Sequence, residues 1–502
     1  ELLAASTPVE TIWLNPSDII ISKSQKSRLA ILLKMRENHL DDQLRKKNTH
    51  HVYLRRQISP ELAGKIMAMK IPGIYSKKNY RRYYPGKEAM AHVVGFTNID
   101  GDGIEGIELQ SNEFLSGEHG FRKVLKNRKG NVVDDLQDIQ IPVDGKDVIL
   151  SLDKRLQYAA YKALEKAVEK HAALSGSAVL IDAKTGEVLA MSNYPSFNPN
   201  ASRSLKRSKY IKNRVVTDIF EPGSTLKPLT VSAALKNNSV TPSTLIDTAK
   251  GFYRVGKRLT VRDTHANGVI TVKEVVQKSS NIGTTHIVEG LEEKYLWSIL
   301  SSFGMGTKTG IQYPGEVTGK IHHYKDWGET ERATISYGYG ISSTLIQLAQ
   351  AYTVFANDGV IKPISLFKEQ GIVIGQRVVD KKTSNEMLEI LESVVTEGTA
   401  PLAKVKGYRV AGKTGTTKKL DFNEGGYGKN YIGSFVGIAP ASDPRFILAV
   451  MIDEPTLDGY YGGIVAAPVF SSVMTEALKL YSIPQDGIEF KTSKEQKMVY
   501  LN

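Results

Sequence analysis

Apolar runs of strand length lie at both ends of residues 150–481, and a long region with helical patterns separates them. Near the start, residues 153–171 carry apolar side chains at helical spacing, and a short turn joins the apolar runs 177–181 and 187–191. Near the end, three further runs precede a last helical segment: 408–412, 431–438 and 446–452, followed by 468–481. This order predicts a mixed α/β (α+β) domain, in which helices from both ends flank an antiparallel sheet.

The Pro-Val-Asp-Gly-Lys segment at residues 142–146 is a turn-like break, and we place a domain boundary there. The chain of 502 residues is long enough for more than one core. We therefore predict an N-terminal domain over 1–145, a second domain over 146–483, and a polar C-terminal tail over 484–502.

Composition excludes several classes of chemistry. The chain has no cysteine, which excludes disulfides, thiolate metal sites and cysteine nucleophiles. Its ten histidines form no metal-binding pattern, because the pairs at 50–51 and 322–323 point to different sides of their segments. The net charge of +13 accompanies no nucleic-acid-binding motif, so we interpret it as a solvated basic surface. We predict no metal and no nucleic-acid partner, and no run of apolar residues is long enough to span a membrane.

The pattern Ser-x-x-Lys on a helix places a base one turn from a serine nucleophile. It occurs at 151–154, 224–227 and 365–368. Only Ser224 follows a turn, Phe-Glu-Pro-Gly, and begins an apolar helical stretch, where backbone N–H groups favour a developing anion. We therefore predict Ser224 as the nucleophile and Lys227 as its base, and we interpret Lys154 and Lys368 as solvated charges.

The pattern Ser-x-Asn supplies a hydroxyl for proton relay and an amide that holds a substrate. It occurs at 196–198, between two prolines, and at 279–281, after a helical segment. We prefer the second copy, with Ser279 as the relay and Asn281 as a substrate ligand.

The pattern Lys-Thr-Gly on a strand binds an anion through an ammonium and a hydroxyl, and its glycine lets a substrate backbone approach. It occurs at 184–186 in the first hairpin turn, at 308–310 in a glycine-rich loop, and at 413–415. Only the third copy continues an apolar strand. We predict substrate binding there by Lys413, Thr414, Gly415 and Thr416.

The three patterns in this order are the signature of penicillin-binding proteins and class A β-lactamases. Over nearly its whole length, the chain resembles the class B penicillin-binding proteins, especially the division-specific D,D-transpeptidases of Gram-negative bacteria. Besides the three motifs, the matching stretches are 3–9, 82–85, 92–98, 105–108, 176–180, 336–340 and 460–463. Two features depart from the family pattern: Leu345 follows Thr344 where a proline is usual, and residues 418–430 read as a flexible loop.

The resemblance implies a serine D,D-transpeptidase that cross-links peptidoglycan stem peptides ending in D-Ala-D-Ala, in septal cell-wall synthesis, and that β-lactams acylate. It implies an elongated non-catalytic N-terminal pedestal and no cofactor. It also implies a periplasmic location, with a transmembrane anchor ahead of Glu1, and partners among division proteins and a membrane-embedded wall-polymerising glycosyltransferase. The basic segment 122–129 is either such a partner surface or simply solvated.

Other functions remain open at this point. They are an elongation-type transpeptidase, a D,D-carboxypeptidase or β-lactamase in which water accepts the acyl group, and a catalytically inactive β-lactam receptor. The large N-terminal region argues against a β-lactamase, and so does the missing Glu-x-x-Leu-Asn segment between Asn281 and Lys413. The intact nucleophile, base and relay argue against an inactive receptor.

Overall fold

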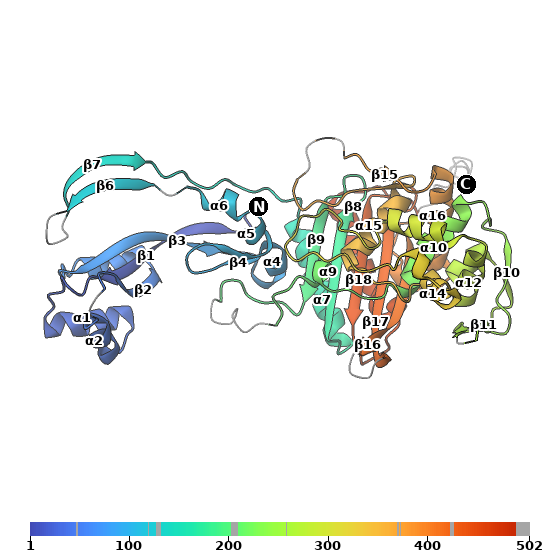
Figure 1. Cartoon of the computed structure of the whole chain (residues 1–502), viewed down its shortest axis with the longest axis horizontal. Coiled ribbons are helices and arrows are strands. Elements are labelled where there is room, and N and C mark those ends of the chain that lie inside the picture. Colours follow the sequence, from blue (N-terminus) through green and yellow to red (C-terminus); the bar gives the residue numbers. More distant parts are fainter. Residues whose placement is uncertain are drawn as a thin grey trace, which may run out of the picture. The chain divides into compact units, whose positions relative to one another are not determined.

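The structure is a computed structural model that describes residues 1–46, 49–118, 120–126, 132–201, 209–257, 259–368, 371, 373–421 and 426–487 (Figure 1). The chain divides into two compact units. The first consists of Glu1–Lys87, Val94–Lys146 and Pro199–Ser202, and the second of Glu88–Val93, Asp147–Asn198 and Arg203–Asn502.

The first unit is built on a three-stranded antiparallel sheet with the strand order β2-β1-β3. Its strands are β1 (Ala5–Leu14), β2 (Val52–Ile58) and β3 (Ile74–Tyr83), and its first helices are α1 (Lys23–Leu33), α2 (Glu37–Leu44) and α3 (Pro60–Met67). Sheet and helices share one apolar core, to which Ile12, Leu29 and Leu40 belong. The unit continues with β4 (Phe96–Thr97), β5 (Gly103–Glu105), α5 (Gly106–Gln110), α6 (Asn112–Ser116), β6 (Phe121–Lys126) and β7 (Val132–Gln140). Of the basic segment 122–129, residues 127–129 lie outside the described residues.

Helix α4 (Lys87–Val94) contributes residues 88–93 to the second unit, although it lies far from that unit in sequence. Ser196 Oγ donates to the Glu88 carbonyl at 2.7 Å, and Asn198 Nδ2 donates to a Glu88 carboxylate oxygen at 2.9 Å. Gln157 Nε2 donates to the Ala89 carbonyl at 2.8 Å. The Ser-x-Asn copy at 196–198 thus has a structural role, because it holds this inserted helix.

The second unit contains a five-stranded antiparallel sheet with the order β16-β17-β18-β8-β9. Strands β8 (Ser175–Asp182) and β9 (Val188–Tyr194) come from the start of the unit, and β16 (Ala411–Asp421), β17 (Gly426–Ala439) and β18 (Phe446–Asp453) come from its end. The two groups join through β18 and β8, where Ala449 lies opposite Val179. This arrangement confirms the predicted antiparallel sheet assembled from both ends.

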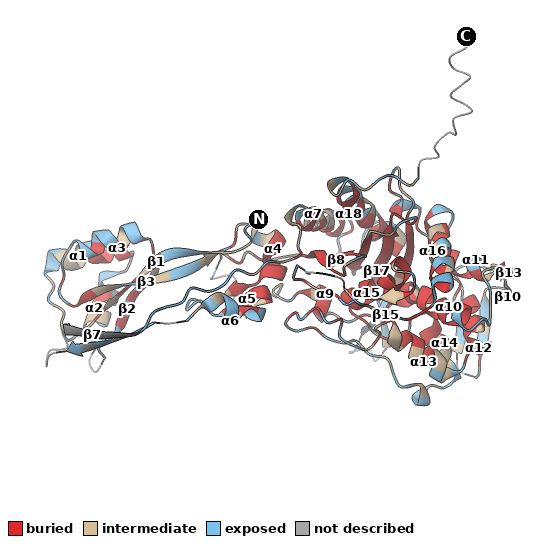
Figure 2. Ribbon diagram, turned by 90° about the horizontal axis from the view of Figure 1, so that it is seen from above, coloured by how far each residue is buried: buried red, intermediate tan, exposed pale blue. Residues whose placement is uncertain are grey.

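Helices cover both faces of this sheet, which is why every residue of β8 is buried (Figure 2). Helices α7 (Lys154–Lys170) and α18 (Ala467–Leu480) pack together on one face, and α15 (Leu345–Ala356) packs on the other against β8 and β18. Asp153 caps α7 as predicted, since its carboxylate accepts from the Arg155 N–H.

Among the described residues, Gly462–Leu480 is the one helical stretch long and apolar enough to span a membrane, and half of it is buried within the domain.

The remaining elements lie between β9 and β16, or between β18 and α18. They are α9 (Arg214–Thr217), η1 (Gly223–Leu226), α10 (Lys227–Lys236), β10 (Leu245–Asp247), β11 (Phe252–Val255), β12 (Leu259–Arg262), β13 (Val269–Thr271), α11 (Val272–Gln277), α12 (Asn281–Glu289), α13 (Glu293–Ser302), η2 (Tyr324–Asp326), α14 (Glu329–Ser336), β14 (Val360–Ile361), β15 (Gln376–Arg377), α16 (Lys381–Thr396), η3 (Pro401–Ala403) and α17 (Gly462–Val465).

Two local expectations were wrong. Residues 408–410 are not part of β16, because Tyr408 closes a turn with Val405. The predicted loop at 418–430 is largely a hairpin, in which Leu420 of β16 lies opposite Tyr427 of β17; residues 422–425 at its tip lie outside the described part.

In the predicted C-terminal tail, Asp486 accepts hydrogen bonds from Arg409 and Ser442, and residues 488–502 are not described.

Candidate active site

Ser224 lies in η1, a 3₁₀ helix of one turn that leads directly into α10. The turn depends on Gly223, whose φ of +53° favours glycine and whose absent Cβ would lie 2.3 Å from Thr417 Cγ2. The Gly223 N–H donates to the carbonyl of Gly338 at 3.0 Å. Ser224 is half-buried, and its hydroxyl has no hydrogen-bond partner within the described part of the chain. A serine held this way is accessible to a substrate.

Lys227 is the first residue of α10 and is fully buried. Its Nζ donates to the Ser279 carbonyl at 2.5 Å and to Ser279 Oγ at 3.2 Å. Burial, and after it the positive charge of Lys413, hold the pKa of the Lys227 ammonium well below its usual value, whereas the carboxylate of Asp263 acts in the opposite direction. A lysine with a lowered pKa can be neutral near pH 7, as a general base must be.

Ser279 lies between the two buried amines. Lys413 Nζ donates to Ser279 Oγ at 3.0 Å, so both Lys227 and Lys413 hold the same hydroxyl. Burial lowers the pKa of Lys413 to about 7. Ser279 has a φ of +63°, a backbone conformation that residues other than glycine rarely adopt. The structure thus brings together three predicted residues, Lys227, Ser279 and Lys413, of which the first two lie 52 positions apart in sequence and the last two 134 positions apart.

Strand β16 passes close to the segment that precedes Ser224. A Cβ on Gly415 would lie 2.4 Å from Ser434 Oγ and 3.1 Å from the Pro222 carbonyl, so the glycine permits this approach. Thr414 is buried and shares a 2.8 Å hydrogen bond with Thr399. Thr416 is half-buried, which makes it the most accessible of the predicted anion-binding residues 413–416.

Lys413 differs from the sequence-based expectation in one respect. Its side chain is fully buried, and its Nζ contacts Ser279 and Thr414. The ammonium therefore lies beside the Thr414 hydroxyl and is not exposed to solvent. Asn281 begins α12, and its Nδ2 donates to the Arg262 carbonyl at 3.0 Å, which orients the amide oxygen.

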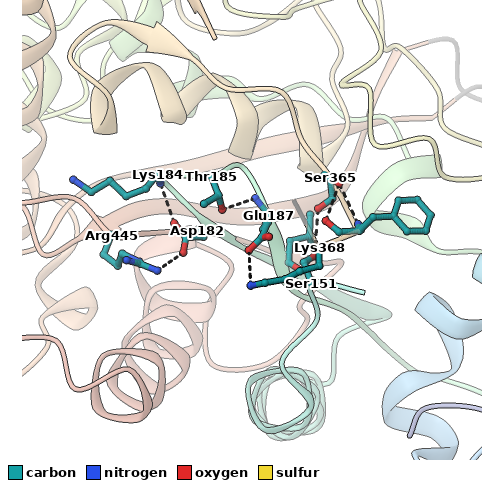
Figure 3. Close-up of polar contacts among 10 residues, drawn as sticks. Ser151, Asp182, Lys184, Thr185, Glu187, Ser365, Lys368 and Arg445 are labelled. Atoms are coloured by element: carbon teal, nitrogen blue, oxygen red, sulfur yellow. Dashed lines mark hydrogen bonds and ion pairs between the residues drawn. The ribbon is translucent and has the colours of Figure 1, made fainter. Parts of the chain in front are cut away.

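The other copies of the motifs have structural roles, and several of them lie together at the turn between β8 and β9 (Figure 3). Ser151 Oγ donates to the Val188 carbonyl at 2.8 Å, and Lys184 pairs with Asp443 at 2.6 Å. Lys368 is largely exposed, but it is not simply a solvated charge, because its Nζ lies 3.4 Å from the buried carboxylate of Glu187.

The copy at 308–310 belongs to a loop that is closed by a buried acid. Thr309 donates to Glu316 through both its N–H, at 2.8 Å, and its hydroxyl, at 2.6 Å. Lys308 is exposed. This threonine is therefore occupied within its own loop.

Sequence reasoning missed two acids beside the motifs. Glu221 accepts from the Gly340 N–H at 2.7 Å and from the Tyr427 hydroxyl at 2.9 Å, which ties the β16–β17 hairpin to the segment before the nucleophile. Burial raises the pKa of Glu221. Asp263, directly after β12, accepts hydrogen bonds from the 279–281 turn. Neither acid belongs to a pattern that has a catalytic meaning by itself, so no signal in one sequence identified them.

The departure at Thr344 has a simple structural consequence. The Thr344 side chain caps α15, and Gln347 completes the capping box. The chain thus begins this helix at Leu345 without the usual proline.

Among the described residues, no group of three or more acidic, histidine or cysteine side chains is placed to hold a metal ion.

Comparisons with known proteins agree along nearly the whole chain. A family profile described as "Penicillin binding protein transpeptidase domain" matches residues 176–475, and one described as "Penicillin-binding Protein dimerisation domain" matches residues 1–150. The chain is 40% identical to the probable peptidoglycan D,D-transpeptidase PbpC of Pseudomonas aeruginosa, over 97% of this chain and 86% of that protein.

It is also 38% identical to the peptidoglycan D,D-transpeptidase FtsI of Escherichia coli, over 97% of this chain and 83% of that protein. Among solved structures, the transpeptidase domain of penicillin-binding protein 3 from Burkholderia pseudomallei matches with a TM-score of 0.62 and 42% identity. That match covers 67% of this chain and 98% of the solved one.

Proposed function

Because this chain belongs to the class B penicillin-binding proteins and is a peptidoglycan D,D-transpeptidase, we propose that it cross-links stem peptides through an acyl-enzyme on Ser224. The observation that carries this assignment is the placement of Ser279 Oγ between Lys227 and Lys413, on the helix and strand beside Ser224. Peptidoglycan is the substrate, and β-lactams bind at the same site.

In the proposed acylation, neutral Lys227 accepts the proton of the Ser224 hydroxyl as Oγ attacks the carbonyl of the D-Ala-D-Ala bond. The backbone N–H groups of Ser224 and Thr416 donate to the oxyanion. Preorganised donors of this kind are worth about 10²–10³ in rate each. Ser279 passes a proton to the leaving nitrogen and regains one from Lys227, so the terminal D-Ala departs with a neutral amine.

The acceptor step reverses the roles of the same groups. The amine of a neighbouring stem peptide attacks the Ser224 ester and loses a proton, which passes through Ser279 to Lys227. Lys227 then returns a proton to Ser224 Oγ as the ester bond breaks. The amide of Asn281 holds the donor peptide. The hydroxyls of Thr414 and Thr416, with the charge of Lys413 behind them, bind the terminal carboxylate, and Gly415 lets the peptide backbone approach.

The lifetime of a penicillin adduct tests this function against hydrolysis. We expect the ester on Ser224 to persist, because the Glu-x-x-Leu-Asn segment that activates a water in class A β-lactamases is absent between Asn281 and Lys413. The measurement is intact-protein mass against time after free drug has been removed. Loss of the adduct within seconds would favour a β-lactamase or carboxypeptidase, and failure to form it would favour an inactive receptor.

A second prediction concerns Lys413 and pH. We expect Lys413→Met to slow acylation by about 10²-fold, because it removes one of the two donors to Ser279 Oγ. The Lys413 charge lowers the pKa of Lys227, so its removal raises that pKa, and the acid side of the pH–rate profile should move to higher pH. Lys184→Met and Lys308→Met are the matched controls and should acylate like the parent protein. An unchanged rate and profile in Lys413→Met would contradict this role.

The wider assignment follows from the same family membership. We propose that the enzyme acts in septal wall synthesis in the periplasm and that its domain at 1–145 is a non-catalytic pedestal for partners, among them a wall-polymerising glycosyltransferase and other division proteins. Two facts support this: residues 1–150 match a dimerisation-domain profile, and none of the chosen motifs lies there. Loss of division in cells that carry only an inactive Ser224→Ala copy, with normal elongation, is the expected result. Loss of elongation alone would favour an elongation-type enzyme.

A further inference from the structure

Asp263 is the one acidic residue whose charge acts on Lys227 among the residues described. It follows β12 directly and accepts a hydrogen bond from the Ser-x-Asn turn, although Asp263 itself belongs to none of the three motifs. We propose that Asp263 is a positioning residue of the transpeptidase, and that its carboxylate both holds the Ser279–Asn281 turn and tunes the neighbouring lysine base. This inference rests on the proposed function.

The contacts of Asp263 cover the whole turn after Ser279. Oδ2 accepts from Ser280 Oγ at 2.5 Å, and Oδ1 accepts from the N–H groups of Asn281 at 2.6 Å and Ile282 at 3.1 Å. Ser280 Oγ in turn accepts from the Gly283 N–H at 2.8 Å. Asp263 and Ser280 together therefore satisfy three of the backbone donors at the start of α12.

The turn requires support because Ser279 has a positive φ. Such a conformation persists in a residue other than glycine only where the surroundings hold it. Lys227 and Lys413 hold the Ser279 side chain and carbonyl, and Asp263 holds the two residues that follow. Without Asp263, Ser279 and Asn281 would no longer be held in register with Ser224. Misplacement of catalytic groups by about 1 Å is enough to cost roughly 10²-fold in rate.

Charge gives Asp263 a second effect. The charged groups that act on Lys227 are Lys413 on β16, which lowers its pKa, and Asp263, which raises it. The two act from different elements and in opposite directions. An aspartate at a helix start is also an ordinary cap, so the test must separate the hydrogen bonds from the charge.

Asp263→Asn and Asp263→Ala separate the two effects. The asparagine retains an oxygen for the N–H groups of Asn281 and Ile282 but removes the charge, whereas the alanine removes both. Asp247→Asn is the matched control: it makes the same charge change at the end of β10, where the exposed Asp247 accepts, among the described residues, only from the Ala249 N–H. The measurement is the second-order rate constant of acylation by a fluorescent penicillin as a function of pH, with thermal unfolding as a check on folding.

We expect Asp263→Asn to move the acid side of the profile to lower pH, the opposite of Lys413→Met, and Asp263→Ala to lower the maximal rate by at least about 10-fold. Asp247→Asn should match the parent. If the parent is acylated and Asp263→Asn leaves the profile in place, the inference is wrong and Asp263 is only a cap. If Asp263→Ala does not fold, Asp263→Asn still decides. A parent that is not acylated at all would overturn the proposed function itself.

Discussion

Replacement of Ser224 by alanine is expected to abolish acylation by a penicillin and to leave the unfolding temperature nearly unchanged. In the proposed mechanism the hydroxyl supplies the bond between enzyme and acyl group. It forms no hydrogen bond within the described residues, so its loss leaves no buried partner unsatisfied. Gly223 and the bond from its N–H to Gly338 maintain the turn in the variant. Intact-protein mass after mixing with penicillin gives the readout.

Ser365→Ala is the control for that experiment. Ser365 is the first residue of another Ser-x-x-Lys copy. Its hydroxyl donates to the Phe367 carbonyl and accepts from the Phe367 N–H. Full labelling of this variant is expected. A penicillin adduct on the Ser224→Ala protein would show that another residue is the nucleophile.

Lys227→Met should slow acylation by about 10³-fold, which is within the usual contribution of a general base. Methionine fills a similar length in the buried site, but it cannot accept the Ser224 proton, and it removes the two hydrogen bonds that the Lys227 amine donates to Ser279, one to the carbonyl and one to the hydroxyl. The rate constant with a fluorescent penicillin, measured from acid to alkaline pH, gives the effect, and no pH should restore the parent rate.

Lys154→Met provides the comparison. Lys154 has the same place in its own Ser-x-x-Lys copy, at the first position of α7, as Lys227 has at the first position of α10. It should react like the parent. If Lys227→Met acylates as fast as Lys154→Met, the base is another group, and the lowered pKa of Lys227 would then reflect burial alone.

Much of the fold could be predicted because local patterns carry it. The helix after Asp153, the hairpin of β8 and β9, and the strands β17 and β18 follow from apolar spacing and turn residues. The hairpin tip near Tyr427 was predicted to be a loop, because Asn, Glu and Gly residues there resemble a linker. In the structure Tyr427 pairs with Leu420, and its hydroxyl donates to Glu221, a residue 206 positions away that no local window contains.

The choice among motif copies was predictable only in part. Secondary structure favoured Ser224 over Ser151 and Lys413 over Lys308, and the structure places the preferred copies together. Their chemical roles stay predictions. Lys368 was misjudged because Glu187, its buried partner, lies on another segment that no spacing rule connects to it.

The sequence by itself determined the order of helices and strands, the residue types at each motif, and the family to which the chain belongs, since these depend on neighbours along the chain. Only the tertiary structure decided that Ser279 lies between two amines, that Lys413 is buried behind Thr414, and that Asp263 supports the turn. The physical reason is burial. A lysine side chain has the same chemistry in every copy of a motif, but the pKa of Lys227 and of Lys413 falls because segments distant in sequence exclude water from both, and for Lys227 also because they place the charge of Lys413 beside it.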